Sequence, residues 1–405
     1  MAVLGALVGV RLLTELLDPA AYGELALGMT LATLVNQTVL GPLGNGVTRF
    51  YAPAMEQGDL GGYLNAVRRL VLSATGIIGL LILFVVAGLL VAGRTDWIAI
   101  ATAALIFAIL SGYNSILNGI QNAARQRSIV AFHQGIESWA RFLVAAALMV
   151  WLGATSTVAM VGYAVAVVLV LGSQYVFLLR IAPKYLTGTE REKNWREQIR
   201  KYSWPISLFG VFTWVQLASD RWALGLSATT QEVGLYAVLF QLGYYPMSLA
   251  TGMAMQFLVP IYFQRAGDAS DSRRNENVRN LSWRLTGLAL GLTSGSFLLM
   301  LLFHAQIFRL LVAEEYASVS PLLPWTLLAG GVFVAGETIA LSLMSQLNTR
   351  AMIAPKIITA LLGVTFNFAG AFWYGITGVV IAGIVFSALY FLWMAAILER
   401  EGVKK

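Results

Sequence analysis

The sequence has no cysteine, only two histidines and few charged residues, and each shortage excludes a kind of protein. Without cysteine there is no disulfide, no thiolate nucleophile and no Cys-based metal site. His133 and His304 lie too far apart in the sequence for metal-ligand spacing. Charged residues make up 12% of the chain, whereas soluble domains carry about 25%. No Walker loop or dinucleotide fingerprint is present, so we predict no metal, no nucleotide and no other cofactor.

Long apolar runs take the place of the missing polar residues. Hydrophobic residues make up 58% of the chain, and the mean hydropathy is +0.73. A helix that crosses a bilayer needs about 20 apolar residues, because the hydrocarbon layer is about 30 Å thick. On this rule we predict an all-α polytopic membrane protein with about twelve transmembrane helices. The predicted spans are residues 2–17, 21–43, 66–92, 97–117, 129–152, 155–180, 203–225, 232–258, 281–304, 321–345, 354–374 and 376–398.

The basic residues concentrate in alternate loops. When the basic residues at the flanks of the spans are counted with the adjoining loops, 22 of the 27 lysines and arginines fall in one set of alternate loops and the tail. Only Arg94 and Arg309 fall in the opposite loops, and only Arg11, Arg141 and Arg221 fall well within apolar segments. Basic loops mark the cytoplasmic side of an inner-membrane protein. We therefore predict a multi-pass protein of the bacterial inner (plasma) membrane with both termini in the cytoplasm. The net charge of +7 then faces anionic lipid headgroups rather than nucleic acid.

The two halves of the chain resemble each other. LLDPAAYGELAL is echoed by SATTQEVGLYAV, which aligns Gly23 with Gly234, and WLGATSTVAMVGYAV is echoed by WYGITGVVIAGIVFS, which aligns Gly153 with Gly375. Six helices in each half predict a parallel repeat about an axis along the membrane normal. The first segment is short and begins abruptly, so we expect part of its helix to be missing. The predicted parts are an N-terminal six-helix bundle (1–180), a basic cytoplasmic linker (181–202), a C-terminal six-helix bundle (203–398) and a cytoplasmic tail (399–405).

Several helix ends carry local signals. Asp18 before Pro19 predicts an N-cap with proline in the first turn, and Thr229 with Glu232 has capping-box spacing. Pro246 lies inside the eighth predicted span, where a missing N–H kinks a helix, and we interpret it as a hinge.

The glycine-rich stretch Gly41-Pro42-Leu43-Gly44-Asn45-Gly46 predicts a break in the second helix. Broken backbone at membrane depth is tolerated only beside protein or a water-filled cavity. Two interpretations stay open, a segment that faces a cavity and a plain turn at the membrane boundary.

Charged residues inside the apolar segments are the candidate functional residues. Each costs roughly 2.5–3.5 kcal/mol on insertion scales, so each indicates a functional site by default. Arg11 and Glu15 share a helix face, His133, Glu137 and Arg141 recur every four residues, and Asp220 precedes Arg221. Arg49 follows the predicted break, and Glu337 has no charged neighbour in its predicted span.

Two longer stretches resemble a known family. LLTELLDPAAYGELALGMTLATLV resembles the start of the polysaccharide-transporter branch of the multidrug/oligosaccharidyl-lipid/polysaccharide (MOP) flippase superfamily. YSWPISLFGVFTWVQLASDRWALG, followed by EVGLYAVLFQLGYYP, is similar to that family's seventh and eighth helices. The resemblance implies a V-shaped, pseudo-symmetric fold like that of the MATE transporters. It also implies transport of a polyprenyl-pyrophosphate-linked oligosaccharide, such as an O-antigen (lipopolysaccharide), capsule or exopolysaccharide repeat unit, from the cytoplasmic to the outer leaflet by alternating access. A polysaccharide polymerase or chain-length machinery is the implied protein partner.

A pyrophosphate crossing hydrocarbon needs a polar, cationic path. We hypothesise that Arg11, Arg49, Arg141 and Arg221 supply it, because guanidinium binds phosphate oxygens in bidentate fashion. The polar lumen would also hold Glu15, His133, Glu137 and Asp220. Glu337 is a candidate for proton or sodium coupling, because burial raises the pKa of a lone carboxylate. The alternatives are that Arg11–Glu15 and Glu137–Arg141 are internal ion pairs and that Arg49 is an interfacial residue.

Three classes of function remain. A flippase for lipid-linked oligosaccharide fits the intramembrane arginines best. An ion-coupled multidrug or small-molecule antiporter of the same superfamily would favour acidic lumen residues instead. A membrane enzyme would need a large catalytic loop on the outer face, but the longest predicted outer loop, residues 305–320, is short. We therefore predict a transporter and not an enzyme.

Overall fold

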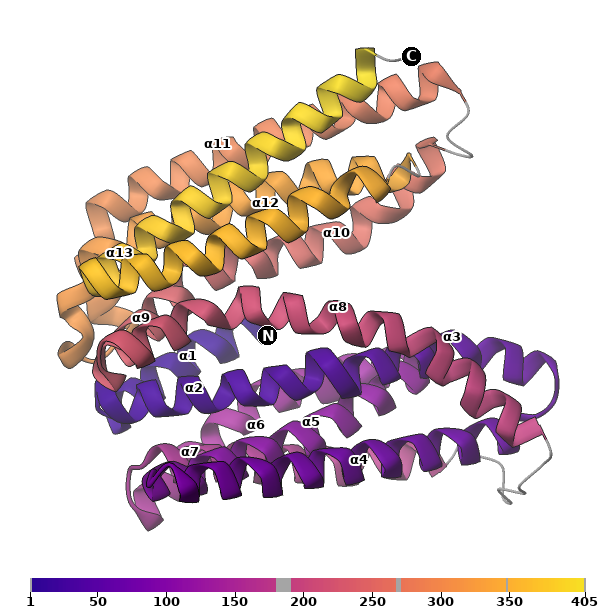
Figure 1. The fold of residues 1–405 in the computed structure, drawn as a ribbon, viewed down its shortest axis with the longest axis horizontal. Coiled ribbons are helices and arrows are strands. Elements are labelled where there is room, and N and C mark those ends of the chain that lie inside the picture. The colour runs from indigo at the N-terminus through magenta and orange to yellow at the C-terminus, as the bar shows by residue number, and fades with distance from the viewer. Residues whose placement is uncertain (1, 180–190, 267–270, 347–348, 404–405) are drawn as a thin grey trace. The chain divides into compact units, whose positions relative to one another are not determined.

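The computed structural model describes residues 2–179, 191–266, 271–346 and 349–403, and all regular structure in these ranges is helical (Figure 1). Within the described residues, seven helices are long and apolar enough to cross a membrane. Large apolar side chains point outward on them, as Leu80 and Phe84 do on α4 (Leu60–Val91). Such a surface needs lipid as its solvent. The expectation of an all-α membrane protein is confirmed, while the count of about twelve spans stays a prediction.

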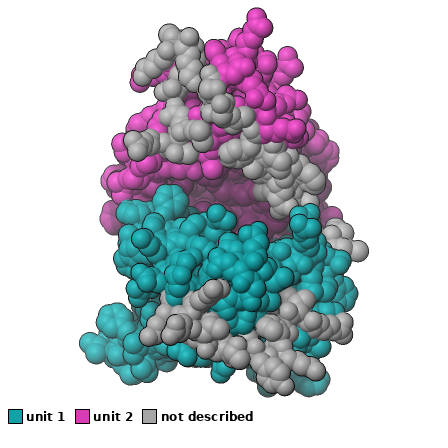
Figure 2. All heavy atoms as spheres, turned by 90° about the vertical axis from the view of Figure 1, so that its right-hand side faces the viewer, with its two compact units in different colours: residues 1–17, 24–214 teal, residues 18–23, 215–405 magenta. Residues whose placement is uncertain are grey.

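The chain divides into two compact units, coloured separately in Figure 2. Unit 1 comprises Met1–Leu17 and Glu24–Trp214, and unit 2 comprises Asp18–Gly23 and Val215–Lys405. The division falls within α8 (Arg191–Ser227). Residues 181–190 of the expected linker lie outside the described residues.

Unit 1 is built from antiparallel helices of the N-terminal half. The short 3₁₀ turn η2 (Thr95–Trp97) joins α4 to α5, and the first part of α8 completes the unit. The other elements are α1 (Ala2–Leu16), most of α2 (Pro19–Val35), η1 (Asn36–Leu40), α3 (Gly41–Glu56), α5 (Ile98–Ala123), α6 (Arg127–Leu152) and α7 (Ser156–Leu179).

Unit 2 holds the rest of α8 and the C-terminal helices. Its 3₁₀ segments are η4 (Glu314–Leu322) and η5 (Thr349–Met352). The other elements are α9 (Thr230–Leu239), η3 (Phe240–Tyr244), α10 (Tyr245–Ala266), α11 (Ser272–Leu311), α12 (Leu323–Ser345) and α13 (Ile353–Val403).

The predicted break at Gly41–Gly46 is wrong. α2 passes through the π-helical turn η1 directly into α3, and Pro42 lies in the first turn of α3. Proline has no N–H to donate within an α-helix, and its ring clashes with the carbonyl group one turn earlier. The wider π turn leaves room for the ring and does not need that hydrogen bond. The glycines serve packing instead, because a Cβ on Gly46 would lie 2.5 Å from Ser203 Oγ of α8.

A π-helical turn also precedes Pro246. The π-helical turn η3 directly precedes α10, in which Pro246 is the second residue. Single π turns inside helices are often found at functional sites. The irregularity predicted from proline is therefore present as a π turn, and its use as a hinge stays a prediction.

The two predicted helix caps are confirmed. Ala21 N–H donates to Asp18 Oδ1 at 2.8 Å, and Glu232 N–H donates to Thr229 Oγ1 at 3.2 Å. Each side chain satisfies one of the N–H groups that a helix start leaves without a partner.

The glycines aligned by the two sequence echoes share backbone features, and one pair also shares its surroundings. A Cβ on Gly23 would lie 1.9 Å from the carbonyl oxygen of Thr230, and a Cβ on Gly234 would lie 1.9 Å from that of Pro19. The contact is thus reciprocal within unit 2. Gly153 and Gly375 both have positive φ, +105° and +55°, which glycine adopts without strain. Gly375 interrupts α13, so the two last predicted spans are separate helical arms.

Candidate functional site

An ion pair in unit 1 joins two of the predicted site residues. Arg141 donates from Nη2 to Glu137 Oε1 at 2.8 Å, one helical turn apart on α6. Glu137 Oε2 accepts a second hydrogen bond from Asn114 Nδ2 of α5 at 2.5 Å. Side-chain exposure is 14% for Glu137 and 28% for Arg141. We call Asn114, Glu137 and Arg141 the unit 1 cluster.

Aromatic rings hold the Arg141 guanidinium. Its central carbon lies 5.4 Å from the centroid of the Phe107 ring and 5.7 Å from that of the Tyr163 ring, within range of a cation–π interaction. Its Nε is buried and has no hydrogen-bond partner among the described residues. Arg141 therefore keeps one donor whose hydrogen-bonding capacity the described residues leave unused.

His133 does not join this cluster. The side chain is buried, its Nδ1 lies 2.8 Å from the Ile129 carbonyl oxygen, and its Nε2 lies 3.0 Å from Ser173 Oγ. The ring also packs edge-on against Phe177 of α7. These contacts give His133 a role in holding α6 against α7. The predicted stripe of three residues is thus divided between two environments.

A network of buried amides in unit 1 was not predicted. Gln174 Nε2 of α7 donates to Asn118 Oδ1 of α5 at 2.7 Å, and Gln121 Nε2 donates to the Gln174 carbonyl oxygen at 3.4 Å. Asn114, Asn118 and Gln121 follow one another at intervals of three or four residues in α5. This spacing of amide side chains in an apolar helix was the sequence signal from which a polar helix face could have been predicted.

The remaining unit 1 candidates are more accessible. Arg11 and Glu15 form an ion pair along α1, with side-chain exposures of 38% and 49%. Arg49 is exposed on α3, and no described carboxylate pairs with it. Such exposure suits an interfacial position as well as a binding surface.

In unit 2, Asp220 and Arg221 are held by different partners. Asp220 Oδ2 accepts a hydrogen bond from the Tyr236 hydroxyl at 2.8 Å. Arg221 donates from Nη1 to the Leu217 carbonyl oxygen at 3.0 Å, and its guanidinium lies 4.3 Å from the centroid of the Phe240 ring. The distance between Arg221 Nη1 and Asp220 Oδ1 is 3.5 Å. Asp220, Arg221 and Tyr236 are the unit 2 cluster.

Asp220 and Tyr236 of the unit 2 cluster line a small, partly open pocket of about 60 Å³. Its polar lining comes from α8, α9, α12 and α13, and Tyr244 of η3 also contributes. Asn367 Nδ2 of α13 donates to Ser219 Oγ at 2.9 Å, beside the pocket. The polar lining residues are Gln216, Asp220, Tyr236, Tyr244, Thr326 and Asn367.

Glu337 is not the lone carboxylate that the sequence indicated. Lys356 Nζ of α13 lies 3.6 Å from Glu337 Oε1, and the Tyr390 hydroxyl donates to the same oxygen. Glu337 and Lys356 lie within a few turns of the connection between α12 and α13, which brings distant sequence positions together. Within the described ranges, no group of three or more His, Asp or Glu side chains is placed to hold a metal ion.

Comparisons with known proteins identify the relatives of this chain. Residues 2–265 match the family described as polysaccharide biosynthesis protein. A comparison with curated proteins found no match.

Solved structures with similar folds include transporters of several kinds. An inward-facing multidrug resistance MATE transporter of the MOP superfamily is 15% identical, with a TM-score of 0.71 and coverage of 99% of this chain and 95% of that one. The lipid II flippase MurJ, in an inward closed conformation, is 13% identical, with a TM-score of 0.74 and coverage of 98% and 86%. A MOP superfamily transporter from Pyrococcus furiosus is 16% identical, with a TM-score of 0.61 and coverage of 99% and 92%.

Proposed function

The chain belongs to the polysaccharide biosynthesis protein family and has the MOP superfamily fold, and on this premise we propose that it is a flippase for a polyprenyl-pyrophosphate-linked oligosaccharide. Family and fold are those of membrane transporters and not of enzymes, as the sequence indicated. The cargo would be an O-antigen, capsule or exopolysaccharide repeat unit, moved from the cytoplasmic to the outer leaflet by alternating access. The likeness to the lipid II flippase MurJ supports the lipid-linked cargo.

The observation that carries the proposal is the set of contacts that the guanidinium groups make within apolar helices. Arg141 and Arg221 each lie against an aromatic ring, and Arg141 keeps a buried donor without a partner. A guanidinium in this setting attracts phosphate oxygens strongly, because little water competes for its N–H groups. Arg11 and Arg49 would extend the cationic path.

A second function, that of an ion-coupled multidrug or small-molecule antiporter, is favoured by two carboxylates in unit 2. Asp220 and Glu337 are each bonded to a tyrosine hydroxyl and accompanied by a cation. The likeness to a multidrug resistance MATE transporter supports this alternative. The same carboxylates would serve proton or sodium coupling in a flippase.

The basic loops support a bacterial inner-membrane location with cytoplasmic termini as part of this proposal. A polysaccharide polymerase would then receive the cargo on the outer face. The test is leaflet-resolved accumulation of lipid-linked oligosaccharide in cells that lack this gene. We expect intermediates on the cytoplasmic leaflet, and we expect the full-length gene to clear them.

Variants of the two arginines make the test specific. Arg141→Ala and Arg221→Ala should fail to clear the intermediates while inserting normally into the membrane. Arg94→Ala is the matched control, because it removes an exposed cation at a loop. Normal clearance by both Ala variants would remove the argument for a cationic path.

A further inference from the structure

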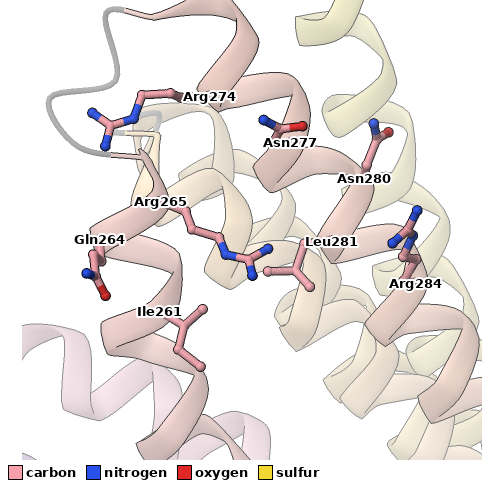
Figure 3. Close-up of a pocket in the computed structure, with 8 residues that line it drawn as sticks. All are labelled: Ile261, Gln264, Arg265, Arg274, Asn277, Asn280, Leu281 and Arg284. Carbon is pink, nitrogen blue, oxygen red and sulfur yellow. The ribbon is translucent and has the colours of Figure 1, made fainter.

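A second cationic site lies at the basic end of the α10–α11 hairpin in unit 2. There the two helices enclose an open cleft of about 750 Å³ (Figure 3). Its described lining is dominated by guanidinium and amide groups, with no carboxylate among them. The cleft is lined by Ile261, Gln264, Arg265, Arg274, Asn277, Asn280, Leu281 and Arg284.

Helix periodicity produces this arrangement. Arg274, Asn277 and Arg284 lie three and seven residues apart, so they share one face of α11. Arg265 extends from α10 toward that face, near Leu281 (Figure 3). Three guanidinium groups therefore border one opening.

No carboxylate among the described residues neutralises the three arginines. In the described part of the chain, none of Arg265, Arg274 and Arg284 forms an ion pair with a carboxylate. Asp271 is used as the N-cap of α11, where its Oδ1 accepts the backbone N–H groups of Arg273 and Arg274 at 2.8 and 3.3 Å. As far as the described residues go, the charge of the three arginines is available to a ligand.

The apolar surface next to the cleft indicates what kind of ligand this is. Leu288 and Leu292 follow Arg284 at intervals of four residues, so they continue the stripe of Arg284 along α11. Their exposures are 59% and 61%. A ligand with an anionic head and a hydrocarbon chain would satisfy both parts, the head at the arginines and the chain along the leucines.

We propose that this cleft binds the phosphoryl group of a lipid headgroup. Arginine forks pair with phosphoryl oxygens, and the amides of Gln264, Asn277 and Asn280 hydrogen-bond hydroxyl groups carried by the head. An anionic phospholipid and a polyprenyl pyrophosphate share this chemistry. If the lipid is the transported cargo, the cleft is a loading site and the inference rests on the proposed function; if it is a membrane lipid, the inference stands alone.

Binding to the full-length protein tests the proposal. The protein is placed in phosphatidylcholine nanodiscs, and the affinities of a short polyprenyl pyrophosphate and of phosphatidylglycerol are measured by microscale thermophoresis. The cleft variant is Arg274→Gln/Arg284→Gln. The control is Arg273→Gln/Arg279→Gln, which removes the same charge from the same helix outside the cleft lining.

We expect at least one lipid to bind the wild type, the cleft variant to lose about tenfold or more in affinity and the control to change less than about twofold. Preference for the pyrophosphate would identify the cargo, and preference for phosphatidylglycerol would identify a membrane lipid. Equal losses of affinity in the cleft variant and the control would show that only the net charge of the helix matters, and this would overturn the proposal. Absence of binding to the wild type would overturn it too.

A measurement on the wild type keeps the test valid if a variant fails to fold. Phenylglyoxal modifies accessible arginines, and mass spectrometry locates the modified positions. Bound lipid should protect Arg265, Arg274 and Arg284 and leave Arg273 reactive. Uniform reactivity with and without lipid would contradict the proposal. Neither experiment measures transport, so the cleft and the flippase proposal can fail separately.

Discussion

Each unit holds an arginine near a carboxylate within apolar helices, but the hydrogen-bond partners of the two groups differ between the units. In the unit 1 cluster, Arg141 and Glu137 bond directly at 2.8 Å. In the unit 2 cluster, the Arg221 guanidinium lies farther from its carboxylate, 3.5 Å from Asp220 Oδ1. Asp220 accepts a hydrogen bond from Tyr236, and Arg221 donates to a backbone carbonyl and lies against the Phe240 ring. The backbone features are alike, since Gly23 and Gly234 contact reciprocally and Gly153 and Gly375 share positive φ. The aligned glycines are therefore alike in backbone, while the charged groups of the two units bond differently.

The largest effect that this comparison predicts is on stability in unit 1. Glu137→Ala should lower the free energy of unfolding by about 3 kcal/mol, because it leaves a largely buried guanidinium without its counter-charge. Glu137→Ala/Arg141→Met should recover most of the loss, since no charge is then left unpaired. Thermal unfolding in detergent, followed by tryptophan fluorescence, measures both. No recovery in the double variant would show that packing, not charge, causes the loss.

The shared glycine contact gives the next effect. Gly234→Ala should cost about 2–3 kcal/mol, because its Cβ would meet the Pro19 carbonyl oxygen, which belongs to rigid backbone. Gly23→Ala should cost as much if the two positions are equivalent. Gly79→Ala on α4 is the control, because a Cβ there meets nothing within 4 Å, and it should be neutral or stabilising. Unequal costs at the two glycines would break the equivalence of the halves.

A smaller effect on stability is expected from the tyrosine hydrogen bond of the unit 2 cluster, which has no described counterpart in the unit 1 cluster. Tyr236→Phe removes the hydrogen bond to Asp220 and should cost about 1.5 kcal/mol, as is usual for a hydrogen bond to a charged group. Tyr374→Phe is the control, because Tyr374 is exposed on α13. Equal unfolding temperatures for the two variants would mean that Arg221 and not Tyr236 satisfies Asp220.

Much of the fold could be predicted from the sequence, because the length of an apolar run decides whether a helix can cross a bilayer. The caps at Asp18 and Thr229 rest on contacts within one turn, which a sequence shows directly. The π turn before Gly41 could not be predicted, since it depends on how the helices pack.

The contacts between cluster residues on different helices could not be predicted from the sequence either. Arg141 and Glu137 share one helix, so their spacing predicted the pair. Asn114 and Lys356 come from other helices, and periodicity gives the faces of one helix but not the neighbour that each face meets. Glu337 was therefore taken for an unpaired carboxylate.

The smallest predicted effect concerns coupling. Glu337→Gln removes the charge that faces Lys356 but leaves a group that can still accept from Tyr390. We expect transport to persist and its dependence on the proton or sodium gradient to weaken. Transport assayed with each gradient in turn measures this dependence. An unchanged dependence would reject the coupling role and leave the residue as part of a structural pair.

The central claim is that the cargo is a lipid-linked oligosaccharide. Its most direct test uses the purified full-length protein in proteoliposomes that contain a fluorescent polyprenyl-pyrophosphate oligosaccharide on the inner leaflet, with a membrane-impermeant quencher outside. The account predicts rapid loss of fluorescence with the wild-type protein and slow loss with Arg141→Ala and with empty liposomes. Equal rates in all three, together with export of a cationic drug by the wild type, would contradict it and favour the antiporter.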